Sequence, residues 1–429
     1  MRYLSLNVEA ESPLVIRADH AAGGAGSAGY ISGTALLGSL AAVYRSYYPE
    51  DAQAFGRLFL SGEAQYPDLY PANFNSQSMQ NANTSPVYPL PKTAQSCKRF
   101  AGFPYLADEK REEERHGVRD SLLDWAVFEI GKQATANKNN LSINIETLLH
   151  PLEGNKECPV CKNSMDHFTG FYRRSSAGRM ARAEASTRLL TRTGINRETG
   201  TVQEGILYNR RVFDEHTRFW GMLKMPEDLA ASLTDFINEV GQSGLVRIGT
   251  GRTRGSGKAH LNLDPQVVEQ ESFETRLQKF DYLLREQAVK AYDKTIKPYL
   301  SQFYFALTLH SPAILRDEML RYRGSIDARA LCGLLRMPED SAGSFELIYQ
   351  AASARRVMGW NEMWGTPRTN EYAIDTGSVF LFAFKGEDKQ VDPLKQALLR
   401  LEEEGIGQRR AEGFGRVCIC DPFHREVEL

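Results

Sequence analysis

Residues that bind transition metals occur together in one part of the chain. Cys158 and Cys161 form a Cys-x-x-Cys pair in ECPVCKNSMDH, and two thiolates at this spacing reach one tetrahedral zinc ion. Cys97 is the third thiol of this region, and we choose His116 as the fourth ligand. The histidines that compete for the fourth position are His150 and His167. We therefore predict a closed structural zinc site without a catalytic role.

A redox function is the alternative for this Cys-x-x-Cys pair. Such a pair normally opens a helix of a thioredoxin-like unit, and the sequence around Cys158 shows no such unit. The sequence positions of the remaining cysteines indicate that their side chains pack in the core and do not bind metal. Cys418 and Cys420 flank Ile419 on a predicted strand, and Cys332 lies in an apolar helical segment.

A glycine-rich basic segment, RIGTGRTRGSGKAHL, occupies residues 247–261 and contains four glycines, four basic residues and no acid. It is not a P-loop, because Arg252 stands in place of the first glycine and Ala259 follows Lys258. It is not a dinucleotide fingerprint either, because Arg254 replaces the third glycine. Backbone amides beside basic side chains still suit a phosphate. The predicted phosphate contacts, which the family resemblance described below assigns to RNA, are Gly249, Gly251, Arg252, Arg254, Gly255, Gly257 and Lys258.

A second segment of this kind, EGIGQRRAEGFGRVCIC, occupies residues 404–420. It aligns without gaps with the first, so that Gly407 matches Gly249 and Arg416 matches Lys258. Phe414 adds an aromatic surface of the kind on which single-stranded RNA stacks its bases. The predicted RNA contacts here are Gly405, Gly407, Arg409, Arg410, Gly413, Phe414, Gly415 and Arg416. The alternative is that the glycines form tight turns and the arginines a solvated surface.

A third basic tract, FYRRSSAGRMARAEASTRLLTRTG, occupies residues 171–194. Its arginines clearly outnumber its acidic residues, so the tract could line an RNA channel. We include Arg188 and Arg192 among the predicted RNA contacts, beside Arg173, Arg174, Arg179 and Arg182. The alternative is a charged helix and hairpin on the solvent surface.

The same succession of elements surrounds both glycine-rich segments. RFWGMLKM (218–225) and SVFLFAFK (378–385) are predicted strands, and each is followed by a segment with apolar residues at helical spacing. A strand follows each glycine-rich segment, and a strand and a helix open each half of the chain. This repetition indicates an internal duplication at domain scale. The order βαββαβ predicts an α+β fold with two ferredoxin-like domains of the RRM type.

The predicted domain boundaries follow from this succession. The first ferredoxin-like domain covers residues 1–265 and carries a large insertion at about 48–185. A connecting helix lies within 266–300, and the second domain covers 301–429. We expect the insertion to contain little core of its own and to be braced by the zinc site.

Composition limits the function classes. The chain has 429 residues, 42% of them hydrophobic, and a net charge of -2, so any polyanion site must come from local clustering of basic residues. Six cysteines do not make a disulfide scaffold in a chain of this size, which favours the reducing cytoplasm. Glu9 and Glu11 interrupt the N-terminal apolar run, so we expect no signal peptide, and no apolar stretch is long enough to span a bilayer.

Several of these motifs resemble those of one protein family. YISGTALLGSLAAVY, RTGINRETGTVQEGILYNRRVF and RRVMGWNEMWGTPRTNEYAIDTGSVFLF, together with the paired glycine-rich loops, resemble the RAMP superfamily of CRISPR proteins. The last stretch is similar to the large two-domain subunits that cap the 5′ handle of CRISPR RNA. The insertion with its Cys-x-x-Cys resembles the variant of that subunit in type III-D effectors. The resemblance implies a cytoplasmic, prokaryotic RNA-binding subunit whose partners are CRISPR RNA, a large polymerase-like subunit and backbone RAMP subunits.

Two alternatives to a non-catalytic RNA-binding subunit stay open. A CRISPR RNA-processing endoribonuclease would use a general base, and His20 is placed near the first helix. We expect His20, His216 and His260 each to stand alone, which disfavours catalysis. A protein-only interaction scaffold is the second alternative, and salt-dependent RNA binding would distinguish it. The sequence contains neither a GGDD-like motif nor a His-Asp tandem, which excludes a polymerase and an HD nuclease.

Overall fold

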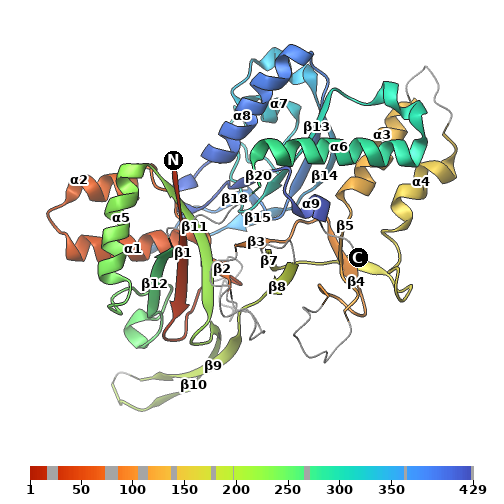
Figure 1. The fold of residues 1–429 in the computed structure, drawn as a ribbon. Helices are drawn as coiled ribbons and strands as arrows, with labels where there is room; N and C mark the ends of the chain where they lie inside the picture. Colours follow the sequence, from red (N-terminus) through yellow and green to blue (C-terminus); the bar gives the residue numbers. More distant parts are fainter. Residues whose placement is uncertain are drawn as a thin grey trace.

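The computed structural model contains two four-stranded antiparallel sheets with helices packed on them, and smaller sheets between and below them (Figure 1). The α+β class predicted from the sequence is confirmed. The structure describes residues 1–16, 28–72, 86–104, 115–136, 143–174, 180–196, 198–264, 271–361 and 365–426, without the side chains of 203–206 and 360–361.

The first sheet has the strand order β12-β1-β11-β2. Its strands are β1 (Arg2–Ala10), β2 (Tyr70–Pro71), β11 (Arg218–Met225) and β12 (Ala259–Asp264). From Leu6 to Ala10 alternate residues of β1 are buried, because residues at spacing two share a face and the helices pack on that face. Leu4, Leu6 and Val8 point into that core.

Two helices cover this face of the first sheet. Helix α1 (Gly33–Tyr47) begins at Ser32, whose side chain accepts a hydrogen bond from the amide of Ala35. Helix α5 (Glu227–Val240) buries the stripe that its spacing predicted. That stripe consists of Leu229, Leu233, Phe236, Ile237 and Val240.

The second sheet has the order β14-β19-β13-β20. Its strands are β13 (Phe303–Leu309), β14 (Phe345–Ala351), β19 (Val379–Phe384) and β20 (Val417–Ile419). Every residue of β13 and β19 is buried, so both faces of this sheet are covered. Its core includes α6 (Phe273–Tyr292), α7 (Ala328–Leu335) and α8 (Val391–Glu404).

Helix α3 (Leu122–Ala136) joins the same core, although it lies within the predicted insertion of the first domain. Seven of its residues are buried, and Trp125 stacks on Tyr349 of β14 with ring centres 5.6 Å apart. Gly131 faces the ring of Tyr292, which leaves no room for a larger residue. Helix α3 therefore completes the core of the second sheet instead of forming a core within the insertion.

Short elements fill the space between and below the sheets. The order β5-β4-β6 joins β4 (Ala94–Cys97), β5 (Val118–Asp120) and β6 (Met165–His167), and β3-β7-β8 joins β3 (Val87–Pro89), β7 (Phe171–Arg174) and β8 (Met180–Ala183). A hairpin of β9 (Thr187–Ile195) and β10 (Val202–Phe213) projects at the lower left of Figure 1.

The remaining elements are α2 (Ala52–Phe55), α4 (Ile145–Glu153), α9 (Phe423–Glu426), β15 (Ala354–Val357) paired with β18 (Glu371–Ile374), and β16 (Trp360–Asn361) paired with β17 (Thr366–Pro367). Among the helices in the described ranges, none combines the length and apolar character needed to cross a membrane.

Candidate functional site

The four predicted metal ligands come together in one cluster. Their ligand atoms all lie within 4.8 Å of one another, with Cys97 Sγ 3.5 Å from Cys161 Sγ and Cys158 Sγ 3.4 Å from His116 Nδ1. Tetrahedral zinc with Zn–S bonds of about 2.3 Å requires ligand separations of this order. The competitors His150 and His167 lie outside the cluster.

Three local structures hold the cluster in place. Cys97 ends β4, His116 lies two residues before β5, and Cys158 and Cys161 lie in the turn before β6. The turn is closed by a hydrogen bond of 2.7 Å from the amide of Cys158 to the carbonyl of Asn163. Since β4 pairs with both β5 and β6, the sheet brings together ligands that are far apart in the chain.

The surroundings favour a thiolate at Cys161, whereas burial raises the pKa of the Cys97 thiol. The side chain of Asn163 donates to Cys161 Sγ at 3.1 Å, and this bond lowers the pKa of the Cys161 thiol to about 6. The amide of Phe100 donates to Cys97 Sγ at 3.4 Å. Cys97, His116 and Cys158 are buried. The cluster could therefore hold a metal ion with four protein ligands, which leaves no open coordination position.

The two glycine-rich loops have the same geometry. Gly249 and Gly407 both have positive φ, at 85° and 74°. A Cβ atom at Gly249 would lie 2.4 Å from the carbonyl of Val15, and one at Gly407 would lie 2.4 Å from the carbonyl of Ile314. Glycine is needed here because the loop passes close to the protein's own backbone, so these two positions do not offer an approach to RNA.

Matching anchors fix both loops to the strand that opens each half. The amide of Lys258 donates to Ser12 Oγ at 2.8 Å, and the amide of Arg416 donates to Ser311 Oγ at 2.9 Å. Each serine precedes a proline whose carbonyl accepts from the preceding loop glycine. The duplication predicted from the sequence is thus present in the hydrogen bonding as well.

The first loop exposes its basic tip. Arg254 is exposed, and its guanidinium donates to the hydroxyl of Tyr208 at 3.2 Å. Arg192 of the hairpin donates to the carbonyl of Arg254 at 3.3 Å, and Arg210 lies over the Tyr208 ring at 5.5 Å. Together with Arg252 these residues form what we call the arginine surface: Arg192, Tyr208, Arg210, Arg252 and Arg254. None of its four arginines forms an ion pair with a carboxylate in the described part of the chain.

The second loop is packed against the first half of the protein. The amide of Tyr66 donates to the carbonyl of Ala411 at 3.0 Å, and Thr34 Oγ1 donates to Glu412 at 2.9 Å. A Cβ atom at Gly33 would lie 2.4 Å from the carbonyl of Glu412, so the N-terminus of α1 needs glycine for this contact. The loop therefore joins the two halves of the chain.

Ion pairs occupy the arginines of this second loop. Arg409 pairs with Glu371 and with Glu412, both at 2.7 Å, and its guanidinium lies over the Phe414 ring. Arg410 donates to the carbonyl of Glu404 at 3.3 Å. The sequence predicted phosphate contacts here, whereas the structure gives Arg409 and Phe414 internal partners.

Other predicted RNA contacts are also paired within the chain. Lys258 forms an ion pair with Glu11, and Arg188 pairs with Asp214 at 3.0 Å and Glu215 at 2.5 Å. In the third basic tract, Arg173 is buried, Arg174 pairs with Glu426, and Arg182 pairs with Glu184. Arg179 and His20 lie outside the described residues.

Of the three histidines expected to stand alone, His216 and His260 each have a carboxylate partner, contrary to the expectation from the sequence. His260 Nε2 lies 2.8 Å from a carboxylate oxygen of Glu11, which also pairs with Lys258. His216 Nδ1 lies 3.1 Å from Glu9. Because β1 pairs with β12 and β11, cross-strand neighbours bring these carboxylates to the histidines.

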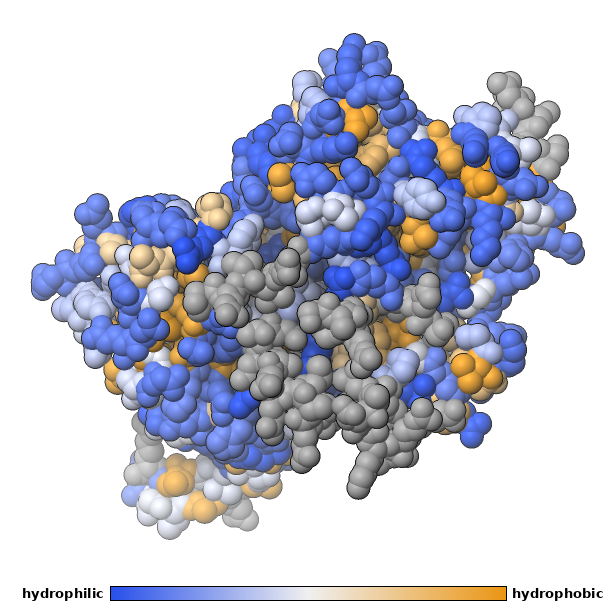
Figure 2. Space-filling model, viewed as in Figure 1, coloured by the Kyte–Doolittle hydropathy of each residue, from blue (hydrophilic) through white to orange (hydrophobic). Residues whose placement is uncertain are grey.

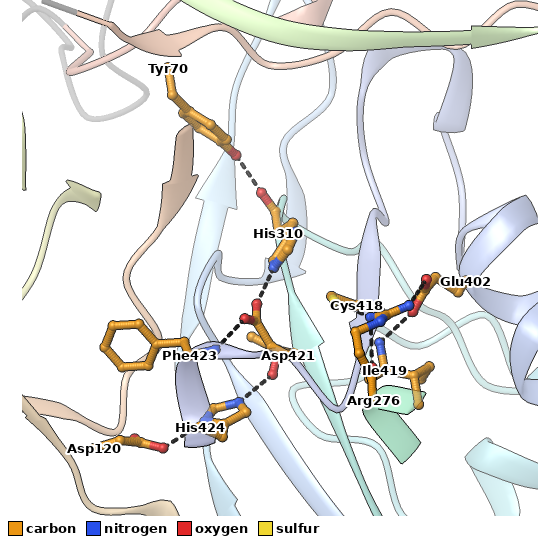
Figure 3. A network of polar contacts seen from close by, with 11 residues as sticks. Tyr70, Asp120, Arg276, His310, Glu402, Cys418, Ile419, Asp421, Phe423 and His424 are labelled. Carbon is orange, nitrogen blue, oxygen red and sulfur yellow. Dashed lines mark hydrogen bonds and ion pairs between the residues drawn. The ribbon is translucent and has the colours of Figure 1, made fainter. Parts of the chain in front are cut away.

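A buried polar network links the C-terminal segment to both halves (Figure 3). The hydroxyl of Tyr70 donates to the carbonyl of His310, whose Nε2 lies 2.5 Å from Asp421. His424 Nδ1 lies 2.7 Å from Asp120. Burial opposes the charge on His424, but Asp120 and Asp421 raise its pKa. Burial alone would raise the pKa of Asp421, and bonding to His310 instead keeps it low.

A second set of potential ligands lies in this network, made of His310, Cys418 and Asp421. The guanidinium of Arg276 donates to Cys418 Sγ at 2.8 Å and pairs with Glu402 at 2.5 Å (Figure 3). A metal cation bound here would lie beside the positively charged guanidinium of Arg276, which already donates to the sulfur. This arrangement favours a structural network over a metal site.

Sequence reasoning missed Tyr208 and Arg210 of the arginine surface. They lie on β10 in YNRR, where an aromatic residue is followed by two arginines, and that interleaving was the available signal. It gave no indication that the base of the hairpin lies beside the first glycine-rich loop.

No protein-family model matches the sequence, and no curated protein matches it. Similar solved structures include three chains from cryo-EM structures of the type III-B Cmr-beta complex. The chain in the apo state has 13% identity and a TM-score of 0.30, covering 62% of this chain and 99% of that chain. A chain bound to cognate target RNA and AMPPnP in state 1 has 14% identity, a TM-score of 0.34 and coverages of 92% and 93%. A third chain comes from the complex bound to cognate target RNA. It has 13% identity and a TM-score of 0.34, covering 96% of this chain and 96% of that chain. At these TM-scores the likeness does not establish a shared fold.

Proposed function

We propose that this chain is a non-catalytic RNA-binding subunit of a type III CRISPR effector complex that holds the 5′ handle of the guide RNA. The arginine surface carries this proposal. Its four guanidinium groups lack carboxylate partners in the described ranges. Those of Arg210 and Arg254 contact Tyr208, and that of Arg192 contacts the first loop at the carbonyl of Arg254. A guanidinium group binds a phosphate through two parallel hydrogen bonds, and an aromatic ring stacks on an unpaired base.

The position of this surface also suits a single strand. It lies where the first loop meets the projecting hairpin, and the tip of the loop, from Thr253 to Gly255, is exposed. Lone arginines on a surface are commonly solvated, but Arg192, Arg252 and Arg254 come from two separate elements and converge. Convergence of charge without acids is what a polyanion site requires.

The strand orders support the ferredoxin-like assignment of both halves. In each half a βαββαβ succession gives a sheet in which the first and third strands are central. This is the arrangement expected of paired RRM-type domains, with boundaries at 1–265, 266–300 and 301–429. The type III-D subtype rests on the resemblance of the Cys-x-x-Cys insertion alone.

The projecting hairpin is the proposed contact to other subunits of the complex. Leu189, Ile195, Val202 and Leu207 are exposed on it, and Figure 2 shows apolar atoms gathered there. Exposed apolar groups on an extended element usually mark an interface. The fitting partners are backbone RAMP subunits and the large polymerase-like subunit.

The metal cluster is proposed to hold one structural zinc ion. Three thiols and one imidazole at these separations match the Cys₃His set of closed zinc sites. Cys97, His116, Cys158 and Cys161 would hold the ion, which would fix β4, β5 and β6 and, through β5, the start of α3.

The endoribonuclease alternative has one observation in its favour. Glu11 lies between His260 and Lys258 beside the first loop, so a base and a cation lie close to the proposed RNA surface. An acid–base pair at a phosphate is what RNA cleavage needs. No second base converges on the same point in the described residues, which favours binding without cleavage.

RNA binding tests the main proposal. Arg252→Ala with Arg254→Ala should weaken binding of repeat-derived RNA and make its affinity less dependent on salt. The slope of log affinity against log salt should fall by about 0.7 for each phosphate of the single strand that no longer meets a basic side chain. Arg2→Ala, an exposed residue of β1, is the matched control. Unchanged affinity and slope in the double variant would contradict the proposal.

A further inference from the structure

A cavity of about 830 Å³ lies between the two large sheets. One wall is the face of the first sheet that α1 and α5 leave free, with Tyr3 of β1 and Trp220 and Lys224 of β11. Arg416 and Cys418 at β20 line the opposite wall. Neither loop tip nor the metal cluster lines this cavity, so it is a separate site.

Lys224 is a buried cation in this cavity. Its residue is 4% exposed, and Nζ lies 5.4 Å from the centre of the Tyr3 ring. No carboxylate oxygen of the described residues lies within ion-pair distance of it. The charged groups that act on it are Arg416, which opposes its charge, and Glu402, Glu403 and Glu404, which favour it from the end of α8.

Arg416 is the second cation of the cavity. Its Nη2 donates to the carbonyl of Gln65 at 3.3 Å, and its Nε has no hydrogen-bond partner in the described structure. Its backbone is fixed by Ser311, so the side chain is held in the cavity rather than directed to solvent. A guanidinium with five donors and one weak protein acceptor is incompletely satisfied.

Most other charges of the cavity have partners, and the carboxylate of Asp68, which also lines the cavity, accepts from the amide of Gly33 and attracts Arg416 without forming an ion pair with it. Arg276 pairs with Glu402, and Arg174 pairs with Glu426. Asp421 is bonded to His310, and Glu271 pairs with Arg425 and Lys279. Two positive charges without ion pairs therefore remain, on facing walls of one cavity.

Burying two cations without carboxylate partners is unfavourable unless an anion joins them. The cavity also has aromatic walls, with Tyr3, Tyr70, Tyr88 and Trp220. We propose that this cavity binds a phosphate ester that carries an aromatic base, with the phosphate between Lys224 and Arg416 and the base against the tyrosines and Trp220. A volume of this size holds a mononucleotide.

The same chemistry is offered by a free nucleotide and by the phosphorylated end of an RNA strand. The first source would make the cavity a small-molecule site, and the second would make it a site for an RNA terminus. The proposal does not depend on the arginine surface, because none of the residues of that surface lines the cavity.

Calorimetric titration of the full chain tests this proposal. The ligands are AMP, adenosine and inorganic phosphate, followed by a short RNA with a 5′ phosphate and the same RNA with a 5′ hydroxyl. We expect AMP or the 5′-phosphorylated RNA to bind at least tenfold more tightly than its dephosphorylated counterpart. Preference for AMP indicates a free nucleotide, and preference for the RNA indicates a strand end.

Lys224→Met and Arg416→Gln should each weaken this binding at least tenfold, while Lys132→Met on the exposed side of α3 should leave it unchanged. Thermal melting without ligand controls for folding, and Lys224→Met should melt no lower than wild type. Arg252→Ala with Arg254→Ala should retain AMP binding, which separates this site from the proposed RNA surface. Absence of phosphate-dependent binding to the folded wild type, or unchanged binding by Lys224→Met, would overturn the proposal.

Discussion

The guanidinium of Arg409 lies over the ring of Phe414, with Cζ 4.7 Å from the ring centre. The same guanidinium forms ion pairs with Glu371 and Glu412, and its side chain is 17% exposed. One face of the Phe414 ring and most hydrogen-bond donors of Arg409 thus contact other residues of the chain and are not free for a ligand. Glu412 in turn accepts from Thr34 of the first half, so this loop tip is closed, whereas the equivalent tip of the first loop stays open to solvent.

Arg409→Ala should therefore lower stability more than RNA affinity. Removing the guanidinium leaves two partly buried carboxylates without their partner, a change that costs about 1–3 kcal/mol of the free energy of unfolding. Chemical denaturation measures this decrease. Arg410→Ala is the matched control, because Arg410 is exposed and weakly paired. A fall in RNA affinity at unchanged stability would show instead that the second loop binds RNA directly.

Purified protein should contain about one zinc ion per chain by elemental analysis. Cys158→Ser should lose most of this metal and become more sensitive to protease near β4 and β6, because the ligands hold these strands together. Cys332→Ala is the control, since this thiol is buried in α7 and lies outside the cluster. A metal-free wild type that is fully folded would contradict the zinc assignment.

Lys224 should make stability depend on pH. Burial, with Arg416 opposing its charge, lowers the pKa of Lys224 to about 8. The unfolded chain, with a lysine pKa near 10.4, then binds more protons than the folded chain above pH 8, so stability rises with pH in that window. Between about pH 8 and 9.5 the gain is about 1.5 kcal/mol. The difference in the free energy of unfolding between wild type and Lys224→Met, measured across this pH range, isolates the contribution of Lys224. Equal slopes of stability against pH for both proteins would contradict it.

The hairpin should mediate contact with other subunits. Leu189→Ser with Leu207→Ser should reduce copurification with the other effector subunits while leaving the melting temperature within about 2 °C, because both side chains are exposed. Tyr282→Ser, an exposed residue of α6, is the control. Undiminished assembly of the hairpin variant would place the subunit contact elsewhere.

The chain should leave repeat RNA intact, with or without divalent metal. A closed four-ligand site offers no open position to a metal-bound water, and in the described ranges His260 has Glu11 but no second base. Gel analysis of incubated RNA is the measurement. Specific cleavage that disappears in His260→Ala or in His20→Ala would instead indicate a processing endoribonuclease.

Local patterns in the sequence predicted many of the elements and the residues of the Cys/His cluster. Helix α5 buries the residues that its apolar spacing indicated, and Cys158 and Cys161 lie in one turn as a Cys-x-x-Cys pair requires. Gly249 and Gly407 have positive φ because each loop turns back on its own strand. These features depend on neighbouring residues and on helical or strand periodicity, which a sequence contains directly.

Contacts between distant segments decided the rest. The second loop is closed to ligands because Glu412 packs on Gly33, in the other half of the chain, and nothing near either residue specifies that contact. Helix α3 joins the second core for a similar reason, since its apolar face fits any complementary surface. Along the chain, Lys224 reads as an ordinary surface cation, and the sequence predicted Arg416 as an RNA contact of the second loop. Only the approach of the two sheets removes water from both and brings their charges to one cavity.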